Sequence, residues 1–352
     1  MSRTPVRADL ADLEPYGAPQ LDVPVRLNTN ETAEPPPPEY LAEVGRRIQS
    51  LHLNRYPDRT HLRLRQLLAQ RVDLSVGQTW VANGSNEVLA QLLQAYGGSG
   101  RRLVTVRPGY SMYPVLARVT ATEFVEVDLD DDFTWSDRVV DEVVASAPDV
   151  VFLPNPNNPT GMPVPVDVLA RLHDLVDPAL VVMDEAYVEF GGTSMVDEVG
   201  RWERLVVSRT FSKAFRLAGL RVGYLHGPDW VVDDVRRVRL PYHLDAIKQV
   251  AAAVALEREA TFLDHRSRVA SERERVMAVL GAMDGVTVWP SVANFVLFRV
   301  PDAADVFAQL LDRGVLVRDF STKPRLQGCL RVTIGTTPEN DEFLAALADV
   351  TT

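Results

Sequence analysis

The spacing of apolar residues predicts helices interleaved with strands from about residue 80 onward. The segment SNEVLAQLLQAYG (85–97) repeats its apolar residues at helical intervals and ends in glycine. The segment DVVFLP (149–154) is apolar after its first residue, as expected for a parallel strand that helices cover on both faces. The remaining elements predicted in this region are strands at 101–106, 122–129, 179–187, 204–211 and 222–227 and a helix at 164–176. We therefore expect an α/β fold with a mostly parallel sheet.

The pattern changes after Pro241 and predicts a second, smaller unit. Residues 244–283 keep helical spacing without interruption, so we expect one long helix there. We place the boundary between the two units in this helix, which gives a large domain at 31–245 and a small α+β domain at 246–352. The elements predicted after the long helix are strands at 286–290, 293–300, 314–320 and 329–335 and helices near 302–313 and 338–349.

Composition and charge narrow the class of protein. The chain has 352 residues, of which 46% are hydrophobic, which is enough for a large core. Its formal net charge of −11 disfavours binding to nucleic acid or to an anionic membrane. Cys329 is the only cysteine and the six histidines show no metal-ligand spacing, so we predict neither a disulfide nor a metal site. The N-terminus lacks a signal peptide and no apolar run is long enough to span a membrane, so we expect a cytoplasmic protein.

Polar clusters follow several of the predicted strands, at the point where each strand ends. The clusters are RPGYSMY (107–113), NPNNPTG (155–161), DEAY (184–187) and TFSK (210–213), and ANGSNE (82–87) opens a helix. The carboxyl ends of parallel strands meet at one edge of a sheet, where ligands bind in open α/β folds. We therefore predict a ligand site at this edge.

One group of these residues is suited to holding a phosphate. The start of a helix offers free backbone amides and the positive end of the helix dipole. Hydroxyls and a guanidinium nearby can add hydrogen bonds and charge around the same anion. The group consists of Gly84, Ser85 and Asn86 at the helix start, together with Thr210, Ser212 and Arg221.

A second group is suited to holding an aromatic aldehyde. Lys213 carries an amine that becomes a nucleophile when burial lowers its pKa. Asp184 ends an apolar strand, where a carboxylate is costly unless it has a partner. Tyr110 offers a flat ring, Asn158 an amide and Tyr187 a phenol. Pyridoxal phosphate needs all of these groups, with the lysine as its Schiff-base partner, so we predict it as the cofactor.

Six motifs together resemble those of one family. They are NRYPD (54–58), ANGSNE (82–87), NPNNPTG (155–161), DEAYVEF (184–190), RTFSKAFRLAGLRVGY (209–224) and LRVTIGTTPEND (330–341). From about residue 14 to the C-terminus, the chain resembles the histidinol-phosphate aminotransferases, which are fold-type I pyridoxal-phosphate enzymes. The resemblance implies a large domain with a mostly parallel sheet between helices, a smaller α+β domain, and an N-terminal arm at 1–30 that covers the active site.

The resemblance also implies a role for each residue of the two groups. Lys213 forms the Schiff base and, with Asp184 and Tyr187, carries the catalysis. Asp184 pairs with the pyridine nitrogen, while Asn158 and Tyr187 bond the ring oxygen. Tyr110 stacks on the ring, and the group described above surrounds the phosphate.

Four further residues are implied to reach the substrate or the cofactor. Tyr56 would extend from a second subunit, which makes the active unit a homodimer. Arg331 would bind the substrate carboxylate and Arg318 the substrate phosphate, while Asn30 lies in the segment that covers the site. From the sequence alone, the two arginines could instead be ordinary salt-bridge partners, and Tyr56 could simply pack at the dimer contact.

The implied reaction moves an amino group between L-histidinol phosphate and 2-oxoglutarate, as a step of histidine biosynthesis. Lys213 would move the proton between the substrate α-carbon and the cofactor. Three alternatives stay open at this point: an aromatic or specialised-pathway aminotransferase on the same scaffold, a phosphothreonine-type decarboxylase, and a cofactor-binding regulator without turnover.

The sequence departs from the family pattern at a few positions. NETAEPPPP (30–38) stands where the family tends to have Asn-Glu-Asn-Pro and a short turn, and its proline run predicts a short extended loop. Arg216 replaces a residue that is frequently small, and Asp245 replaces a common serine or asparagine. A negative charge at Asp245 would disfavour a phosphorylated substrate, so these departures bear on the substrate and not on the cofactor.

Overall fold

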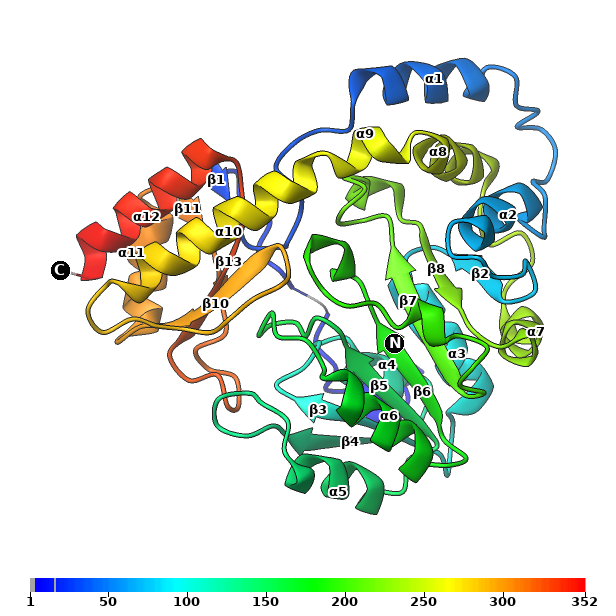
Figure 1. The fold of residues 1–352 in the computed structure, drawn as a ribbon, viewed down its shortest axis with the longest axis horizontal. Coiled ribbons are helices and arrows are strands. Elements are labelled where there is room, and N and C mark those ends of the chain that lie inside the picture. The colour runs from blue at the N-terminus through cyan, green and yellow to red at the C-terminus, as the bar shows by residue number, and fades with distance from the viewer. Residues whose placement is uncertain (1–3, 16, 352) are drawn as a thin grey trace.

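The computed structural model describes residues 4–15 and 17–351, and a seven-stranded sheet forms its centre (Figure 1). The strand order is β2-β8-β7-β6-β5-β3-β4. Strand β8 runs antiparallel to both of its neighbours, and the other strands of the sheet share one direction. The predicted α/β fold class is therefore confirmed. The strands are β2 (Thr79–Ala82), β3 (Arg102–Arg107), β4 (Glu123–Asp128), β5 (Val150–Pro154), β6 (Leu180–Asp184), β7 (Leu205–Thr210) and β8 (Gly223–His226).

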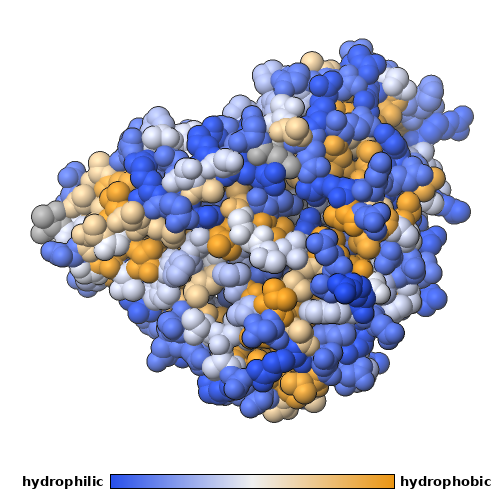
Figure 2. Space-filling view, viewed as in Figure 1, coloured by the Kyte–Doolittle hydropathy of each residue, from blue (hydrophilic) through white to orange (hydrophobic). Residues whose placement is uncertain are grey.

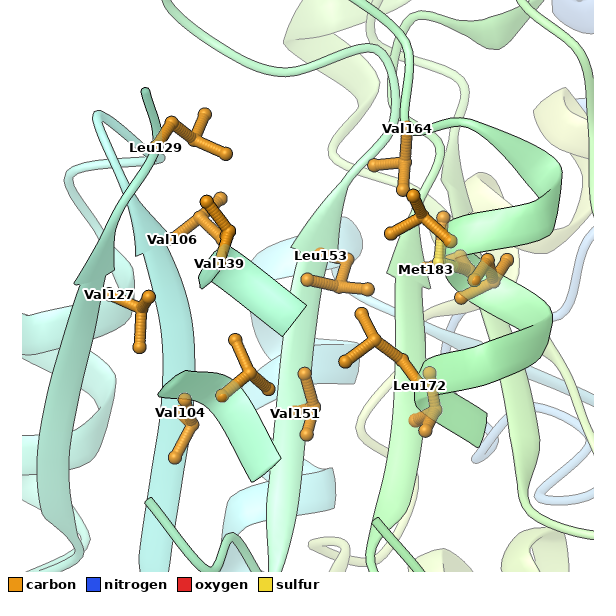
Figure 3. Close-up of a cluster of buried hydrophobic side chains, with 14 of the residues drawn as sticks. Val104, Val106, Val127, Leu129, Val139, Val151, Leu153, Val164, Leu172 and Met183 are labelled. Atoms are coloured by element: carbon orange, nitrogen blue, oxygen red, sulfur yellow. The ribbon is translucent and has the colours of Figure 1, made fainter. Parts of the chain in front are cut away.

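Helices cover both faces of this sheet because its central strands are apolar on both sides. In β5, Val151 and Leu153 pack in the cluster of one face, whereas Val150 and Phe152 pack in the cluster of the other. Figure 3 shows the first cluster, in which Val151 and Leu153 lie between Val104 and Val106 on one side and Met183 on the other. One face is covered by α5 (Asp137–Ala145) and α6 (Val166–Leu175), and the other by α3 (Ser85–Tyr96), α4 (Tyr113–Val119) and α7 (Asp229–Val238).

A separate antiparallel sheet, in the order β12-β13-β10-β9, forms a smaller unit at the left of Figure 1. Its strands and helices bury one apolar cluster that includes Phe295, Phe298 and Phe343. This architecture agrees with the smaller α+β unit predicted from the sequence. Its elements are α10 (His265–Gly281), β9 (Thr287–Val288), β10 (Phe295–Arg299), α11 (Ala303–Asp312), β12 (Arg318–Asp319), β13 (Cys329–Thr333) and α12 (Thr337–Thr351).

The segment 314–320 forms two short strands where the sequence predicts one. Strand β11 (Val315–Leu316) pairs in parallel with β1 (Val25–Arg26), whereas β12 pairs antiparallel with β13. The chain therefore passes from one sheet to another at Val317. Through this pairing, the N-terminal segment is held against the smaller unit.

The single long helix predicted over 244–283 is wrong, because three consecutive helices occupy this region. They are α8 (Ala246–Glu257), α9 (Glu259–Leu263) and α10. Arg258 leaves the helical conformation with φ −120° and ψ 27°, and His265 Nδ1 lies 2.7 Å from the carbonyl oxygen of Phe262. Such a side-chain contact competes with the helical hydrogen bond of that carbonyl. Neither break contains glycine or proline, so apolar spacing alone did not reveal them.

The predicted proline loop runs directly into a helix. Pro38 is the first residue of α1 (Pro38–Ile48), a position that tolerates proline because its N–H would have no partner in the helix. Helices α1 and α2 (Leu62–Gln70) pack against α8.

Short 3₁₀ turns occur at Ala8–Leu10, Val188–Phe190, Val196–Glu198 and Ala218–Leu220.

The surface is mainly hydrophilic, with apolar residues in separate clusters, one of them over α11 and α12 at the left end of Figure 2. Within residues 4–15 and 17–351, every helix is too short or too polar to cross a membrane.

Candidate active site

A cavity of about 590 Å³ lies where the central sheet meets the N-terminal segment and the smaller unit. Pro154 and Asp184, the last residues of β5 and β6, form part of its wall. The polar clusters that follow separate strands are therefore brought together, as the sheet topology predicts. The predicted site residues that line the cavity are Asn30, Ser85, Asn86, Tyr110, Asn158, Asp184, Tyr187, Thr210, Ser212, Lys213, Arg221, Arg318 and Arg331.

Lys213 extends into this cavity, and its Nζ donates a hydrogen bond of 2.9 Å to the backbone carbonyl of Thr29. The pKa of Lys213 is lowered to about 7, mainly by burial and with a contribution from the positive charges of Arg331 and Arg221, whereas the charge of Glu31 opposes the shift. A lysine with this pKa is partly neutral near neutral pH, so it can act as a nucleophile and as a base.

Asp184 is buried with only one of its two carboxylate oxygens engaged. The hydroxyl of Tyr113 donates a hydrogen bond of 3.0 Å to Oδ2, while Oδ1 has no hydrogen-bond partner among the described residues. Burial raises the pKa of Asp184 to about 6, and the bond from Tyr113 works in the opposite direction. The open oxygen belongs to a carboxylate in the cavity wall, where it can accept a hydrogen bond from a bound ring nitrogen.

A hydrogen-bond network joins four segments of the chain around Tyr187. Its hydroxyl accepts bonds from Nδ2 of Asn30 at 3.1 Å and from Nδ2 of Asn158 at 3.4 Å. Oδ1 of Asn158 in turn accepts a bond from Arg331. These residues come from the N-terminal segment, the ends of β5 and β6, and β13, so the network fixes the segments relative to one another.

A cluster of donors lies at the N-terminus of α3. Gly84 precedes the helix with φ +85°, and a Cβ added there would lie 2.8 Å from Nη2 of Arg221. Arg221 donates to the hydroxyl of Ser212 at 3.1 Å, and Thr210 bonds the same hydroxyl at 2.9 Å. A helix start flanked by a guanidinium and two hydroxyls is suited to binding a phosphate.

Tyr110 places an aromatic ring in the cavity wall beside this cluster. Its hydroxyl donates a bond of 3.3 Å to Oδ1 of Asn86, and its ring meets that of Tyr113 edge to face at 5.4 Å. These two contacts fix the orientation of the ring, which can therefore serve as a stacking surface.

Arg318 and Arg331 lie directly opposite each other on the antiparallel strands β12 and β13, and both line the cavity. Arg331 donates a bond of 2.9 Å to the carbonyl of Asn28, and its guanidinium lies 5.3 Å from the ring centre of Phe320. Like charges at opposite positions of neighbouring strands repel each other, and a bound anion removes this cost. The pair is therefore suited to binding an anion on the side of the smaller unit.

Tyr56 and Asp245 lie outside this cavity in the single chain. Tyr56 is 79% exposed, and its ring stacks on that of Tyr242 at 4.2 Å. Asp245 caps α8 by accepting a bond of 2.8 Å from the backbone N–H of Lys248, whose amine lies 3.3 Å from the same carboxylate. The Asp245 carboxylate is thus paired with Lys248 at the start of α8. It is not part of the cavity wall that contains Arg318 and Arg331.

Several residues that line or support the cavity were not found from the sequence. Tyr113, Thr29, Glu31 and Phe320 belong to this group. Tyr113 could have been found from the sequence, because it stands three residues after Tyr110 in the same polar cluster. Thr29 contacts Lys213 through its backbone carbonyl, and Phe320 reaches the cavity because β12 pairs with β13. Neither property can be inferred from the type of residue.

The residues present fit pyridoxal phosphate. The unpartnered Oδ1 of Asp184 suits the pyridine nitrogen, the Tyr110 ring suits stacking, and the donors around Gly84 suit the phosphate. Lys213 is the amine that the aldehyde requires. In the described part of the chain, no group of three or more histidine, cysteine or acidic side chains is placed to hold a metal ion.

Comparison with known proteins identifies the family. Residues 23–347 match the family described as aminotransferase class I and II. Histidinol-phosphate aminotransferase of Streptomyces avermitilis is 47% identical over 360 residues, which cover 98% of this chain and 96% of the relative. Histidinol-phosphate aminotransferase of Mycobacterium sp. strain JLS is 45% identical over 358 residues, which cover 98% of this chain and 93% of the relative.

A solved structure shares the fold. Histidinol-phosphate aminotransferase from Sinorhizobium meliloti, in complex with pyridoxal-5'-phosphate, superposes with a TM-score of 0.89 at 24% identity, over 99% of this chain and 98% of that one. The chain therefore belongs to the pyridoxal-phosphate-dependent class I and II aminotransferases and, within them, to the histidinol-phosphate aminotransferase family.

Proposed function

We propose that this enzyme transfers an amino group between L-histidinol phosphate and 2-oxoglutarate, as a step of histidine biosynthesis in the cytoplasm. The observation that carries the proposal is the position of Arg318 and Arg331 opposite each other in a cavity that also contains Lys213. The donor carries a phosphate and the acceptor carries two carboxylates, so both substrates need a cationic site beside the reacting carbon. The names of the relatives at 45% and 47% identity support the same substrate.

The residues around Lys213 account for the proton transfer. Pyridoxal phosphate, when bound, supplies the electron-withdrawing ring that stabilises negative charge at the substrate α-carbon. Lys213 takes the proton from that carbon, and its pKa of about 7 lets the amine accept and return a proton near neutral pH. When the cofactor is bound, Asp184 would hold the pyridine nitrogen through its open Oδ1, and Asn158 and Tyr187 would hold the ring oxygen.

The two arginines divide the recognition of the substrate anions. Arg331, which is buried and fixed by Asn28 and Asn158, binds the carboxylate next to the reacting carbon of 2-oxoglutarate, and it lies beside the donor's phosphate, because histidinol phosphate has no carboxylate at that position. Arg318 binds the phosphate of the donor or the distal carboxylate of the acceptor. One guanidinium that accepts either anion lets two unlike substrates use the same cavity.

We also propose that the active unit is a homodimer in which Tyr56 reaches the partner's cofactor. The exposed position of Tyr56, outside the cavity of its own chain, supports this part of the proposal. Within each subunit, we propose residues 1–30 as the arm over the site, 31–245 as the cofactor domain and 246–352 as the small domain, with α8, just after the boundary, packed against α1 and α2 of the cofactor domain. Sedimentation of the Tyr56→Phe variant, with its cofactor affinity, tests the role: a dimer that binds the cofactor more weakly is expected.

The test of the reaction is a kinetic comparison of histidinol phosphate with phenylalanine, each paired with 2-oxoglutarate. The proposal requires a higher kcat/KM for histidinol phosphate. A preference for phenylalanine would identify an aromatic aminotransferase, and release of carbon dioxide would identify a decarboxylase. In Lys213→Ala, the absorbance band of the lysine-bound cofactor should vanish; its persistence would refute the role of Lys213.

A further inference from the structure

Glu31 places a carboxylate in the wall of the active-site cavity. It follows Asn30, whose φ of +56° turns the backbone, and its Oε2 accepts a hydrogen bond of 3.0 Å from the hydroxyl of Thr29. The side chain is exposed, so it lies where the cavity is open to water. The Thr29 contact thus restrains a carboxylate in the open part of the cavity wall.

The charged groups of the cavity leave Glu31 without an assigned function. The cationic residues Lys213, Arg221, Arg318 and Arg331 have partners in the cofactor or in the substrate anions, as proposed above. Asp184 is the other carboxylate of the wall. It accepts a bond from Tyr113, and in the proposed function it also binds the pyridine nitrogen. Among the described residues, the hydroxyl of Thr29 is the one hydrogen-bond partner of the Glu31 side chain, and it engages a single oxygen. The second oxygen can therefore accept a bond from a ligand.

The donor substrate of the proposed function has one group that suits such an acceptor. Histidinol phosphate carries an anion at one end and an imidazole at the other, and the imidazole offers N–H donors and a partial positive charge near neutral pH. The phosphate binds at Arg318 and Arg331 in the proposed function. The imidazole therefore lies at another part of the cavity wall, where it needs its own hydrogen-bond partner. Building on the proposed function, we propose that Glu31 accepts a hydrogen bond from the imidazole and thereby selects histidinol phosphate over aromatic amino acids.

This assignment also explains how the two half-reactions share the cavity. Phenylalanine has no N–H on its ring, so it would cover the second oxygen of the Glu31 carboxylate without donating a bond to it. Sites built to bond a polar group reject analogues that lack it for this reason. 2-Oxoglutarate carries no donor, and Glu31 contributes nothing to its binding. Glu31 therefore acts in the donor half-reaction alone.

A rival role for Glu31 is purely electrostatic. Its negative charge raises the pKa of Lys213, in opposition to burial and to the two arginines nearby. If this were its only effect, removing the charge would change the proton transfer for every substrate. The two roles are therefore separated by measuring the half-reactions independently.

The experiment uses the holoenzyme of wild type, Glu31→Gln and Glu31→Leu in stopped-flow measurements of the cofactor absorbance. For histidinol phosphate, we expect kcat/KM to fall between about 10-fold and 100-fold in Glu31→Leu and less in Glu31→Gln, which keeps an acceptor oxygen. For 2-oxoglutarate, the rate should stay within about 2-fold of wild type, and for phenylalanine it should be unchanged or higher in Glu31→Leu, because no carboxylate is then covered without a bond. Glu39→Gln, an equal charge change at an exposed position of α1, is the matched control and should leave all three rates unchanged.

Two outcomes would overturn the assignment. Equal losses for the three substrates would show that Glu31 acts through Lys213 or through the fold of the segment. An unchanged preference for histidinol phosphate would show that the imidazole binds elsewhere. Both differ from a failure of the proposed function, in which wild type itself would not turn over histidinol phosphate.

Discussion

The guanidinium of Arg216 lies 3.4 Å from the carboxylate of Glu34, so two of the departures from the family pattern meet each other in space. Arg216 also pairs with Asp264 at 2.8 Å, and Glu34 also contacts Arg268 of α10. The side chain of Arg216 is only 8% exposed, and it is absent from the cavity wall. The unusual arginine near the catalytic lysine therefore ties the proline loop to α10 and leaves the substrate cavity unchanged.

Because this ion pair is largely shielded from water, it should contribute to stability. Arg216→Gln is expected to lower the free energy of unfolding by about 1–3 kcal/mol, since Glu34 and Asp264 lose a partner. A double-mutant cycle with Glu34→Gln, followed by urea unfolding, should give a coupling energy of about 0.5–3 kcal/mol. Arg237→Gln breaks an exposed pair with Asp234 and should cost no more than about 1 kcal/mol. A coupling energy near zero for Arg216 and Glu34 would contradict the expected contribution.

The low pKa of Lys213 predicts how the stability of the cofactor-free protein depends on pH. Burial lowers the pKa from 10.5 to about 7, so between these values the unfolded chain binds a proton that the folded chain lacks. The free energy of unfolding should therefore rise with pH in this window, by at most about 1.4 kcal/mol per pH unit, and the contribution is lost as pH falls to 7. Urea unfolding of wild type and Lys213→Met measures it as a difference between the two curves. A difference that stays flat from pH 7 to pH 10 would mean that the amine titrates normally.

Tyr113 is expected to keep Asp184 ionised. The phenol donates to Oδ2, and this bond limits the effect of burial, so that the pKa of Asp184 is raised only to about 6. In Tyr113→Phe the pKa should rise further, so more of Asp184 is protonated at pH 7 and the pyridine nitrogen loses its charged partner. Cofactor affinity should fall about 10-fold at pH 7 and recover as pH increases, because the carboxyl then ionises again. Fluorescence titration with pyridoxal phosphate at several pH values tests this; a loss that is equal at every pH would point to a packing defect instead.

Gly84 is expected to be necessary for the phosphate site because of space as well as backbone conformation. In Gly84→Ala the new methyl group would lie 2.8 Å from Nη2 of Arg221, which would displace the guanidinium. We expect cofactor affinity to fall by about 10-fold or more. The control is Gly98→Ala, which has a similar positive φ of +103° but open space around its Cβ, and which should lose stability without losing cofactor affinity. Equal cofactor losses in the two variants would remove the crowding argument.

Arg318 is expected to act on the substrate and not on the cofactor. Arg318→Ala should reduce kcat/KM for histidinol phosphate by about 100-fold, since a charged hydrogen bond to phosphate is lost, and should leave the cofactor absorbance unchanged. Steady-state kinetics and an absorbance titration measure the two effects. If substrate and cofactor binding fell together, the assigned role would be wrong.

The convergence of the polar clusters could be predicted from the sequence because it depends on topology. Asp184, Asn158 and Lys213 each follow an apolar strand, and parallel strands bring their carboxyl ends to one edge of the sheet. The direction and order of the strands are sufficient for this prediction, and the contacts and distances of individual side chains do not enter it. For the same reason, Ser85 at a helix start could be placed beside a phosphate.

Other features depend on contacts that residue type does not encode. The break at Arg258 comes from its non-helical backbone angles, whereas Asp264 keeps helical angles and the His265 side chain contacts the carbonyl of Phe262. Neither position is glycine or proline, so the helical spacing of apolar residues continues through both. The bond from Tyr113 to Asp184 joins residues 71 positions apart on different elements. Thr29 reaches Lys213 through its carbonyl group, which every residue has.

The parallel pairing of β1 with β11 has a consequence for synthesis of the protein on the ribosome. Residues 25–26 leave the exit tunnel early, but their strand partner at 315–316 is made near the end of translation. Much of the nascent chain can fold around the large sheet before then. The segment that contains Asn30 and Glu31 cannot yet be held by the pairing of β1 with β11. A chain stalled before residue 315 would therefore hold the cofactor residues in place without a completed substrate pocket.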